Sequence, residues 1–415
     1  MASIWIVSLF EPTPVDNTRP MRYMGVAEAA IQAGHHITHF SCSFRHSTKV
    51  QRYEKTEQMQ VKEGYDLVFV HAKPYRKNIS TERLRSHAEF TRNLKVLVEQ
   101  KPKPDAILVA LPPLSHAKFL VEWGKANQVP VIVDIIDPWP DVFTRLFPGP
   151  FKGLSRIVMK PMYKQLRAIL NGCTGLIAIS DQYVQWAKKY NPQLNRTGTF
   201  YPSVPFREVQ EKINTFSVSH PRKDKRLRLI YAGNLGVAYD IPVILQAAEI
   251  LEKERPGTTE FIFAGAGHHK ATIESYQERL KNIQFLGRLG YDDLMANYAQ
   301  ADLGLAQYAK GATQSVTYKL FDYLSAGLPV LNSLMSEMAT LISQHEVGQN
   351  NQPGDAQTLA SGIMQYLDVP GMLERQKANA LAFTAAEGDN EVVYGRIVAF
   401  LLAARKERTA AKAIN

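Results

Sequence analysis

The sequence predicts an α/β protein built from two tandem Rossmann-like domains, each containing a doubly wound parallel sheet. Short apolar runs such as SIWIVSLF, DLVFVHA, DAILVAL and PVIVDII alternate with helical stretches. Apolar strands without polar alternation are typical of parallel sheets that are buried on both faces. The alternation stops after Tyr201 and restarts at LRLIYAG, and a chain of 415 residues is long enough for two such domains.

The break in this alternation defines the expected domain boundaries. We expect an N-terminal domain over residues 1–201 and a C-terminal domain over 227–390. The segment between them, 202–226, has three prolines, many charges and no sustained periodicity, which indicates a linker. Residues 391–415 have the pattern of a helix with a basic tail, and we expect this helix to pack back toward the N-terminal domain. Ligands of doubly wound sheets bind at the carboxyl ends of the strands, so a cleft between the two domains is the expected binding region.

Composition restricts the cellular setting. The two cysteines, Cys42 and Cys173, are too few for a disulfide framework, and this favours a reducing compartment. The first apolar run is too short to span a bilayer and has no basic region before it, so it predicts a strand rather than a signal peptide. We therefore expect a cytoplasmic protein. The net charge of +10 favours anionic partners, although a generally basic surface explains it equally well.

The stretch 314–331, QSVTYKLFDYLSAGLPVL, carries the strongest chemical signal. A polar loop leads into a helix here, and the free N–H groups and dipole of a helix N-terminus favour phosphate binding. Lys319 adds a cation in the first turn. Asp322, one turn further on, is placed to accept hydrogen bonds from a ribose diol. The same pattern also fits an ordinary loop-to-helix junction of an α/β fold.

This stretch resembles the signature of glycosyltransferase family 4, in which two acidic residues separated by seven precede a small–Gly–x–Pro–Val turn. Further stretches resemble the family along nearly the whole chain: AIQAGHHITHF, GLIAIS, YAGNLG, FIFAGAG and FLGRLGYDDLMANYAQADLGLAQY. The resemblance implies a GT-B fold and retaining transfer of a sugar from a nucleotide diphosphate donor, with UDP favoured. It implies no metal and no cofactor.

The chain departs from the family pattern at charged positions. Gln314 occupies the first acidic position, which in the family contacts the transferred sugar, and Asp322 occupies the second, which contacts the ribose. The family's basic pair falls on Asn234 and Tyr239, so neither charge is present. The candidates to replace that pair are Lys319, Arg288 and Lys310. The remaining candidate donor contacts are Gly233, Asn234, Gly236, His268, Ser315, Val316 and Thr317.

Two loops of the N-terminal domain are candidate parts of the site. Asp137 follows a buried strand where family members often place a His-Asp pair near the centre of sugar transfer; we assign it a catalytic role together with Gln314. An Asp before Pro138 also fits a turn or a helix cap. Arg19 and Arg22 belong to the loop 11–23, which replaces a Gly-Gly loop of the family. We expect these arginines to face the cleft, or else to be solvated.

Adjacent histidines do not predict a metal site. In the pairs His35-His36 and His268-His269, the two side chains of a pair point to different sides, and no carboxylate spacing accompanies them.

A basic segment suggests a membrane surface as a partner. Lys152, Arg156, Lys160 and Lys164 recur at every fourth residue beside an apolar face, as in helices that lie on anionic membranes. Pro161 is expected to kink or split this helix. The alternative is a packed helix with a solvated basic face.

These observations favour a retaining glycosyltransferase of bacterial surface polysaccharide or glycoconjugate synthesis. Its acceptor would be a saccharide or lipid-linked, reached from the inner face of the cytoplasmic membrane, and no nucleic acid is expected as a partner. A nucleotide-sugar 2-epimerase on the same architecture and a non-catalytic nucleotide-sugar-binding protein remain alternatives. A nicotinamide dehydrogenase is disfavoured, because GAGHHK is not a complete G-x-G-x-x-G.

Overall fold

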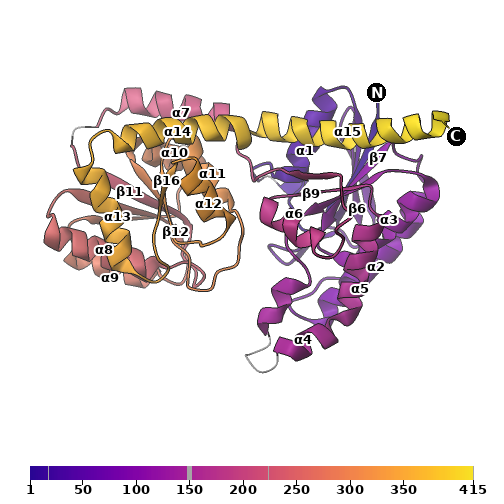
Figure 1. Cartoon of the computed structure of the whole chain (residues 1–415), viewed down its shortest axis with the longest axis horizontal. Coiled ribbons are helices and arrows are strands. Elements are labelled where there is room, and N and C mark those ends of the chain that lie inside the picture. The colour runs from indigo at the N-terminus through magenta and orange to yellow at the C-terminus, as the bar shows by residue number, and fades with distance from the viewer. Residues whose placement is uncertain (17, 147–151, 223, 415) are drawn as a thin grey trace. The chain divides into compact units, whose positions relative to one another are not determined.

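The predicted pair of parallel α/β domains is confirmed by a computed structural model, which describes residues 1–16, 18–146, 152–222 and 224–414. The chain divides into two compact units (Figure 1). The N-terminal unit comprises residues 1–201 together with 393–415, and the C-terminal unit comprises residues 202–392.

The N-terminal unit contains an eight-stranded sheet in the order β10-β9-β8-β7-β1-β2-β6-β5. Every neighbouring pair is parallel except β5–β6. The strands are β1 (Ser3–Val7), β2 (His36–Cys42), β5 (Glu57–Lys62), β6 (Tyr65–Val70), β7 (Ala106–Leu111), β8 (Val131–Ile135), β9 (Gly175–Ala178) and β10 (Thr197–Thr199), with a separate two-stranded ribbon of β3 (Phe44–Arg45) and β4 (Val50–Gln51).

Helices cover both faces of this sheet, and the sequence alternation decides which side chains meet them. Trp5 and Val7 face a core shared with α2, α3, α5 and α6, whereas Ile4 and Ile6 face a core shared with α1 and α15. The helices are α1 (Arg22–Gln32), α2 (Thr81–Glu99), α3 (Leu114–Asn127), α4 (Lys152–Val158), α5 (Lys160–Gly172), α6 (Asp181–Lys188) and α15 (Asn390–Ile414), with short 3-10 turns η1 (Pro14–Asp16) and η2 (Asp141–Leu146).

The C-terminal helix α15 belongs to the N-terminal unit over most of its length (yellow in Figure 1). Val393, Tyr394 and Ile397 are buried in the core that contains α1. The contact is so close that a Cβ on Gly25 of α1 would lie 1.9 Å from the Tyr394 ring, so only glycine fits at this position.

The C-terminal unit contains a six-stranded sheet in the order β13-β12-β11-β14-β15-β16, and all its pairs are parallel. The strands are β11 (Leu227–Asn234), β12 (Thr259–Ala266), β13 (Ile283–Gly287), β14 (Leu303–Ala306), β15 (Val330–Asn332) and β16 (Gly348–Asn350). The helices are α7 (Phe206–Ser219), α8 (Ile241–Glu254), α9 (Lys270–Arg279), α10 (Tyr291–Gln300), α11 (Tyr318–Ser325), α12 (Glu337–Gln344), α13 (Ala356–Asp368) and α14 (Met372–Glu387). Its core is formed mainly by β11, β12, α8 and α13, with residues from β13, β14, β15, α9 and α14.

The segment 202–226, interpreted from the sequence as a linker, differs from that expectation because it contains α7. The prolines of this segment lie outside the helix, and Pro205 occupies the position immediately before it, where its missing N–H costs no hydrogen bond. The helix packs against α10 and α11 of the C-terminal unit.

Arg22 is the structural link between α1 and the strands of the N-terminal unit. Its side chain is buried, and its Nε donates to Asp134 Oδ2 at 2.7 Å while Nη2 donates to Oδ1 at 3.1 Å. Nη1 donates to the carbonyl of Phe200 at 2.9 Å. The expectation that Arg22 faces a cleft or solvent is therefore corrected: its donors are directed to a buried carboxylate and a carbonyl.

We predict that Arg22→Met lowers the free energy of unfolding of the N-terminal unit by about 3–5 kcal/mol, because it leaves the Asp134 carboxylate buried without its cation. All four tryptophans lie within residues 1–201, so urea unfolding followed by tryptophan fluorescence reports on this unit. Lys62→Met is the control, since it breaks an exposed ion pair with Glu28, which contributes about 0–1 kcal/mol. Equal losses for both variants would contradict a structural role of Arg22.

Candidate functional site

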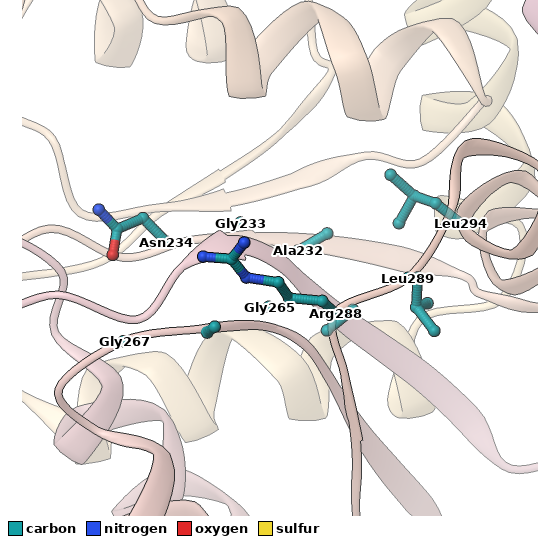
Figure 2. A pocket seen from close by; sticks show the side chains of 10 residues that line it. Ala232, Gly233, Asn234, Gly265, Gly267, Arg288, Leu289 and Leu294 are labelled. Carbon is teal, nitrogen blue, oxygen red and sulfur yellow. The ribbon is translucent and has the colours of Figure 1, made fainter. Parts of the chain in front are cut away.

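The carboxyl ends of three neighbouring strands of the C-terminal unit surround a cavity of 610 Å³. In a parallel sheet these ends share one edge, where the loops of doubly wound proteins bind ligands. Figure 2 shows the cavity, which is lined by Ala232, Gly233, Asn234, Ala264, Gly265, Ala266, Gly267, Arg288, Leu289 and Leu294.

One wall of the cavity is backbone without side chains. Gly233, Gly265 and Gly267 all have positive φ angles, of 136°, 147° and 154°. A Cβ on Gly265 would lie 1.8 Å from the carbonyl oxygen of Gly233, and a Cβ on Gly267 would lie 2.6 Å from the carbonyl carbon of Leu235. Only glycine permits this approach of β11 and β12. The wall therefore offers peptide groups directly to a ligand, as in phosphate-binding turns.

Arg288 brings a guanidinium to the cavity. It follows the last residue of β13, its side chain is exposed, and it extends into the cavity from that side (Figure 2). A guanidinium binds phosphate oxygens in a bidentate manner. The sequence-based choice of Arg288 thus falls on a residue that lines the cavity.

Lys319 reaches the same edge from α11. Its Nζ donates to the carbonyl of Ala232, and a Cβ on Gly233 would lie 2.9 Å from it. The rings of Tyr231, Tyr239 and Tyr323 lie 4.4, 5.4 and 5.8 Å from the ammonium. Burial lowers the pKa of Lys319 to about 8, and the nearby Asp322 carboxylate opposes this effect.

This tyrosine cluster was missed by the sequence reasoning. Its members come from β11, the loop after it, and α11, so no local spacing brings them together. Tyr239 is the position where the family pattern has one of its basic residues. In this chain the ring of Tyr239 faces the Lys319 ammonium. Lys319 brings this cation to the same strand end from α11.

The loop before α11 is held by its own hydrogen bonds. Ser315 is buried, and its carbonyl accepts from Ser336 Oγ at 2.6 Å. Thr317 shares a hydroxyl–hydroxyl bond of 2.7 Å with Tyr308. Val316 is buried, whereas Lys310 and Gln314 are exposed. None of the five residues that the sequence selected here lines the 610 Å³ cavity: Lys310, Gln314, Ser315, Val316 and Thr317.

The remaining residues predicted to contact the donor differ in solvent exposure and in whether they line the cavity. Asn234 lines the cavity, and a Cβ on Gly236 would lie 3.1 Å from its side-chain oxygen. Asp322 is half-buried on α11. His268 is exposed, and its ring lies 5.1 Å from the ring of His269 rather than in the cavity lining. Within the described parts of the chain, there is no cluster of three or more His, Cys, Asp or Glu that is arranged to hold a metal ion.

A second cavity, of 240 Å³, lies at the carboxyl ends of β1, β7 and β8 in the N-terminal unit. Asp137 lines it, as do two residues that the sequence reasoning did not select, Glu11 and Arg83. Glu11 belongs to the loop 11–23, from which the sequence predicts only Arg19 and Arg22 as site residues. Arg19 is exposed and outside the lining of this cavity.

Comparison with known proteins agrees with this geometry. Residues 226–368 match the family model described as Glycosyl transferases group 1. The putative colanic acid biosynthesis glycosyl transferase WcaI of Escherichia coli (strain K12) is 28% identical over 153 residues, which cover 35% of this chain and only 37% of WcaI.

Solved structures resemble the chain over nearly its whole length. Sucrose-phosphate synthase from Thermosynechococcus elongatus superposes with a TM-score of 0.69 at 15% identity, covering 97% of this chain and 100% of that one. Anabaena HepE in complex with UDP has a TM-score of 0.65 at 12% identity, with coverages of 97% and 100%. The chain therefore has the GT-B fold, and its residues 226–368 match the Glycosyl transferases group 1 family.

Proposed function

We propose that the protein is a glycosyltransferase that moves a sugar from a nucleotide diphosphate donor, with a UDP-sugar favoured, to a hydroxyl acceptor. The observation that carries this proposal is the cavity in the family-matched unit, where a glycine backbone wall and Arg288 meet, with Lys319 next to the lining at the Ala232 carbonyl. Such a combination suits a diphosphate, because peptide N–H groups and two cations compensate its charge. The HepE structure contains UDP, which supports the same choice of donor.

We assign the roles as follows. Arg288 and Lys319 stabilise the negative charge that develops on the departing diphosphate, which is the main electrostatic demand of the reaction. Asp322 holds the ribose, Gln314 the transferred sugar, and Asp137 a hydroxyl of the acceptor. The reaction is retaining, so the acceptor hydroxyl attacks from the face that the diphosphate leaves. The contribution of the protein is then positioning and charge stabilisation.

The name of WcaI, a putative colanic acid biosynthesis enzyme, supports a role in surface polysaccharide or glycoconjugate synthesis. A saccharide or lipid-linked acceptor fits that role. From this role we expect a cytoplasmic enzyme that works at the inner face of the membrane.

We predict that UDP, but not uridine at the same concentration, raises the melting temperature. At a ligand concentration of 100 Kd, binding stabilises the folded state by about 2.7 kcal/mol. Incubation with UDP-sugars then separates the alternatives. Release of UDP only when a saccharide acceptor is added supports transfer. Epimer formation without acceptor would identify an epimerase, and donor binding without turnover across the acceptor panel would identify a binding protein.

We predict that Lys319→Gln weakens UDP binding by about tenfold or more and changes uridine binding little, because the lost group is the cation for the diphosphate. In the wild type, the affinity for UDP should fall as the pH rises through about 8, since Lys319 is charged below its pKa and neutral above it. Isothermal titration calorimetry between pH 7 and 9 measures both effects.

Two variants serve as comparisons for Lys319→Gln. Asp322→Ala should weaken UDP and uridine binding alike, since the ribose is common to both. Lys253→Gln, in the last turn of α8 at the opposite edge of the sheet, should change neither. Equal losses of UDP and uridine affinity in Lys319→Gln would mean that Lys319 does not bind the diphosphate.

We also propose that α4 and α5 dock on an anionic membrane surface. Among the described residues, no helix is both long and apolar enough to cross a bilayer. The basic segment is divided between α4 and α5 just before Pro161, as expected. Ile157 and Val158 are 70% and 59% exposed, while Leu166 is in the core, so only part of the apolar face is available to lipid.

The cations of this surface face solvent. Arg156, Lys160, Lys164 and Arg167 are exposed, and three of them line a cavity of 550 Å³ with Asp141. The side chain of Lys152 lies outside the described residues. Each cation near an anionic leaflet contributes about 1 kcal/mol, and the two exposed aliphatic side chains add apolar burial.

We predict that the protein sediments with vesicles containing phosphatidylglycerol, less so as salt rises, and that Arg156/Lys160/Lys164→Glu loses this binding. The matched control is Lys55/Lys103/Lys125→Glu, which changes the net charge equally at other exposed positions of the same unit. Equal sedimentation of both variants, or binding to pure phosphatidylcholine vesicles as strong as to anionic ones, would rule out this docking surface.

A further inference from the structure

The 550 Å³ cavity of the N-terminal unit is lined by residues of η2, α4 and α5 and by Tyr190, which follows α6. Its lining contains three cations, two tyrosines, a threonine and one carboxylate. It shares no residue with the linings of the 240 Å³ and 610 Å³ cavities. Its volume lies within the range of about 300–1,000 Å³ that is typical of ligand sites.

The one carboxylate of this cavity, Asp141, accepts hydrogen bonds from three neutral donors. Its Oδ2 accepts from Trp186 Nε1 at 2.7 Å and from the Tyr190 hydroxyl at 2.9 Å, and its Oδ1 accepts from the Tyr163 hydroxyl. Burial and the hydrogen bond to Asp141 raise the pKa of Tyr163 to about 12, so this phenol keeps its proton at neutral pH. Burial and Asp141 also raise the pKa of Tyr190. The charge of Asp141 is therefore stabilised without the help of a cation.

The three cations, Arg156, Lys160 and Arg167, are left without a carboxylate partner. In the parts of the chain that the structure describes, none of them forms an ion pair with an Asp or Glu side chain. The sequence contains no acidic residue between Asp141 and Asp181. The lining therefore has a formal excess of two positive charges.

This excess of charge selects one class of anion. A phosphodiester carries a single negative charge, whereas a phosphate monoester carries nearly two above its second pKa of about 6. A diphosphate esterified at both ends also carries two, one on each phosphoryl group. Guanidinium groups bind phosphate oxygens in pairs, and an ammonium binds them as a point charge. A dianionic phosphate thus matches the charge of the cavity, and a monoanion leaves one positive charge unmatched.

We propose that this cavity binds one dianionic phosphate group, either a phosphate monoester or a diphosphate esterified at both ends. Arg156 and Arg167 bind its oxygens through paired N–H groups, and Lys160 adds a point charge. The site is separate from the proposed donor site. It also goes beyond the docking of α4 and α5 on anionic membranes, because such docking needs only exposed cations and does not distinguish one anion from another. Both a soluble phosphate ester and the headgroup of a lipid contain such a group.

Saturation-transfer NMR on the full chain at pH 8 and constant ionic strength tests the preference for a dianion. The probes are ethyl phosphate and symmetrical dimethyl diphosphate as dianions, and dimethyl phosphate as the monoanion. UDP is present in excess to keep these probes out of the donor site. We expect both dianions to bind at least about fivefold more tightly than the monoanion. Equal affinity for all three probes, or no binding of either dianion, would overturn the proposal.

Single substitutions on α5 place the binding in this cavity. Lys160→Gln and Arg167→Gln should each weaken dianion binding at least about fivefold, because each removes a charged donor from the lining. Lys164→Gln is the matched control, since it removes the same charge from an exposed position of α5 that lies outside the lining. It should change the affinity by less than about twofold, because salt screens a charge outside the cavity. Equal losses in all three variants, or unchanged binding in the two cavity variants, would overturn the assignment.

Sedimentation with vesicles distinguishes the two sources of the phosphate group. Phosphatidylcholine vesicles containing phosphatidic acid, a monoester, are compared at pH 8 with vesicles of equal surface charge containing phosphatidylglycerol, a diester. Stronger binding to phosphatidic acid that Arg167→Gln loses and Lys164→Gln keeps assigns the group to a lipid. Binding of the soluble dianions with equal sedimentation on both vesicles assigns it to a soluble phosphate ester.

The same samples keep the separate proposals apart. Sedimentation with anionic vesicles, without any binding of the soluble dianions, defeats the phosphate cavity and leaves the docking surface in place. UDP binding, measured on the wild type and on Arg167→Gln, reports on the donor site alone and should be equal in both. A loss of UDP binding in Arg167→Gln would mean that the variant perturbs the fold, and Lys160→Gln would then decide the assignment.

Discussion

The candidate donor site depends on the close approach of β11 and β12 at their carboxyl ends. A side chain at Gly265 would collide with the carbonyl of Gly233, so the two strands reach this edge as bare backbone. This approach leaves the cavity open above the peptide groups and places the Ala232 carbonyl where Lys319 meets it. An alanine at position 265 would separate the strands and displace the wall against which a diphosphate would lie. The glycines therefore act through the space they leave rather than through any contact of their own.

Two cations, the buried Arg22 and the half-buried Lys319, show why residue type alone does not predict a role. Arg22 and Lys319 both follow a loop at the start of a helix, and both were selected as candidate ligands. Arg22 meets a buried carboxylate, Asp134, in two-point contact, so its charge is already compensated within the fold. Lys319 meets a carbonyl and three tyrosine rings, which hold the ammonium in place without neutralising it. The nearby Asp322 carboxylate favours the charged form, but burial outweighs it and lowers the pKa of Lys319, so an anion bound at this edge would stabilise the ammonium further.

The sequence was sufficient for the architecture because parallel strands buried on both faces produce long apolar runs that few other structures share. Two residues selected from the sequence line the 610 Å³ cavity, Gly233 near the end of β11 and Arg288 directly after β13, because the carboxyl ends of these strands meet there. The sequence did not predict features that depend on tertiary packing. The segment containing α7 was interpreted as a linker, because its charges and flanking prolines conceal a helix whose buried face is narrow. Arg83 was overlooked because it lies in the first turns of α2, far along the chain from the loops that it joins.

The loss of the basic pair at Asn234 and Tyr239 is compatible with donor binding because a strand edge can receive charge from several directions. The family pattern implies two cations on the loop after β11. In the proposed donor site of this chain, the corresponding cations come from beyond β13 and from α11. The position that carries a charge in the family pattern is then occupied by Tyr239, whose ring stabilises a charge from elsewhere: it faces the Lys319 ammonium at 5.4 Å. Because electrostatic stabilisation depends on where charge lies relative to the phosphates and not on which residue carries it, the same edge remains suited to a diphosphate.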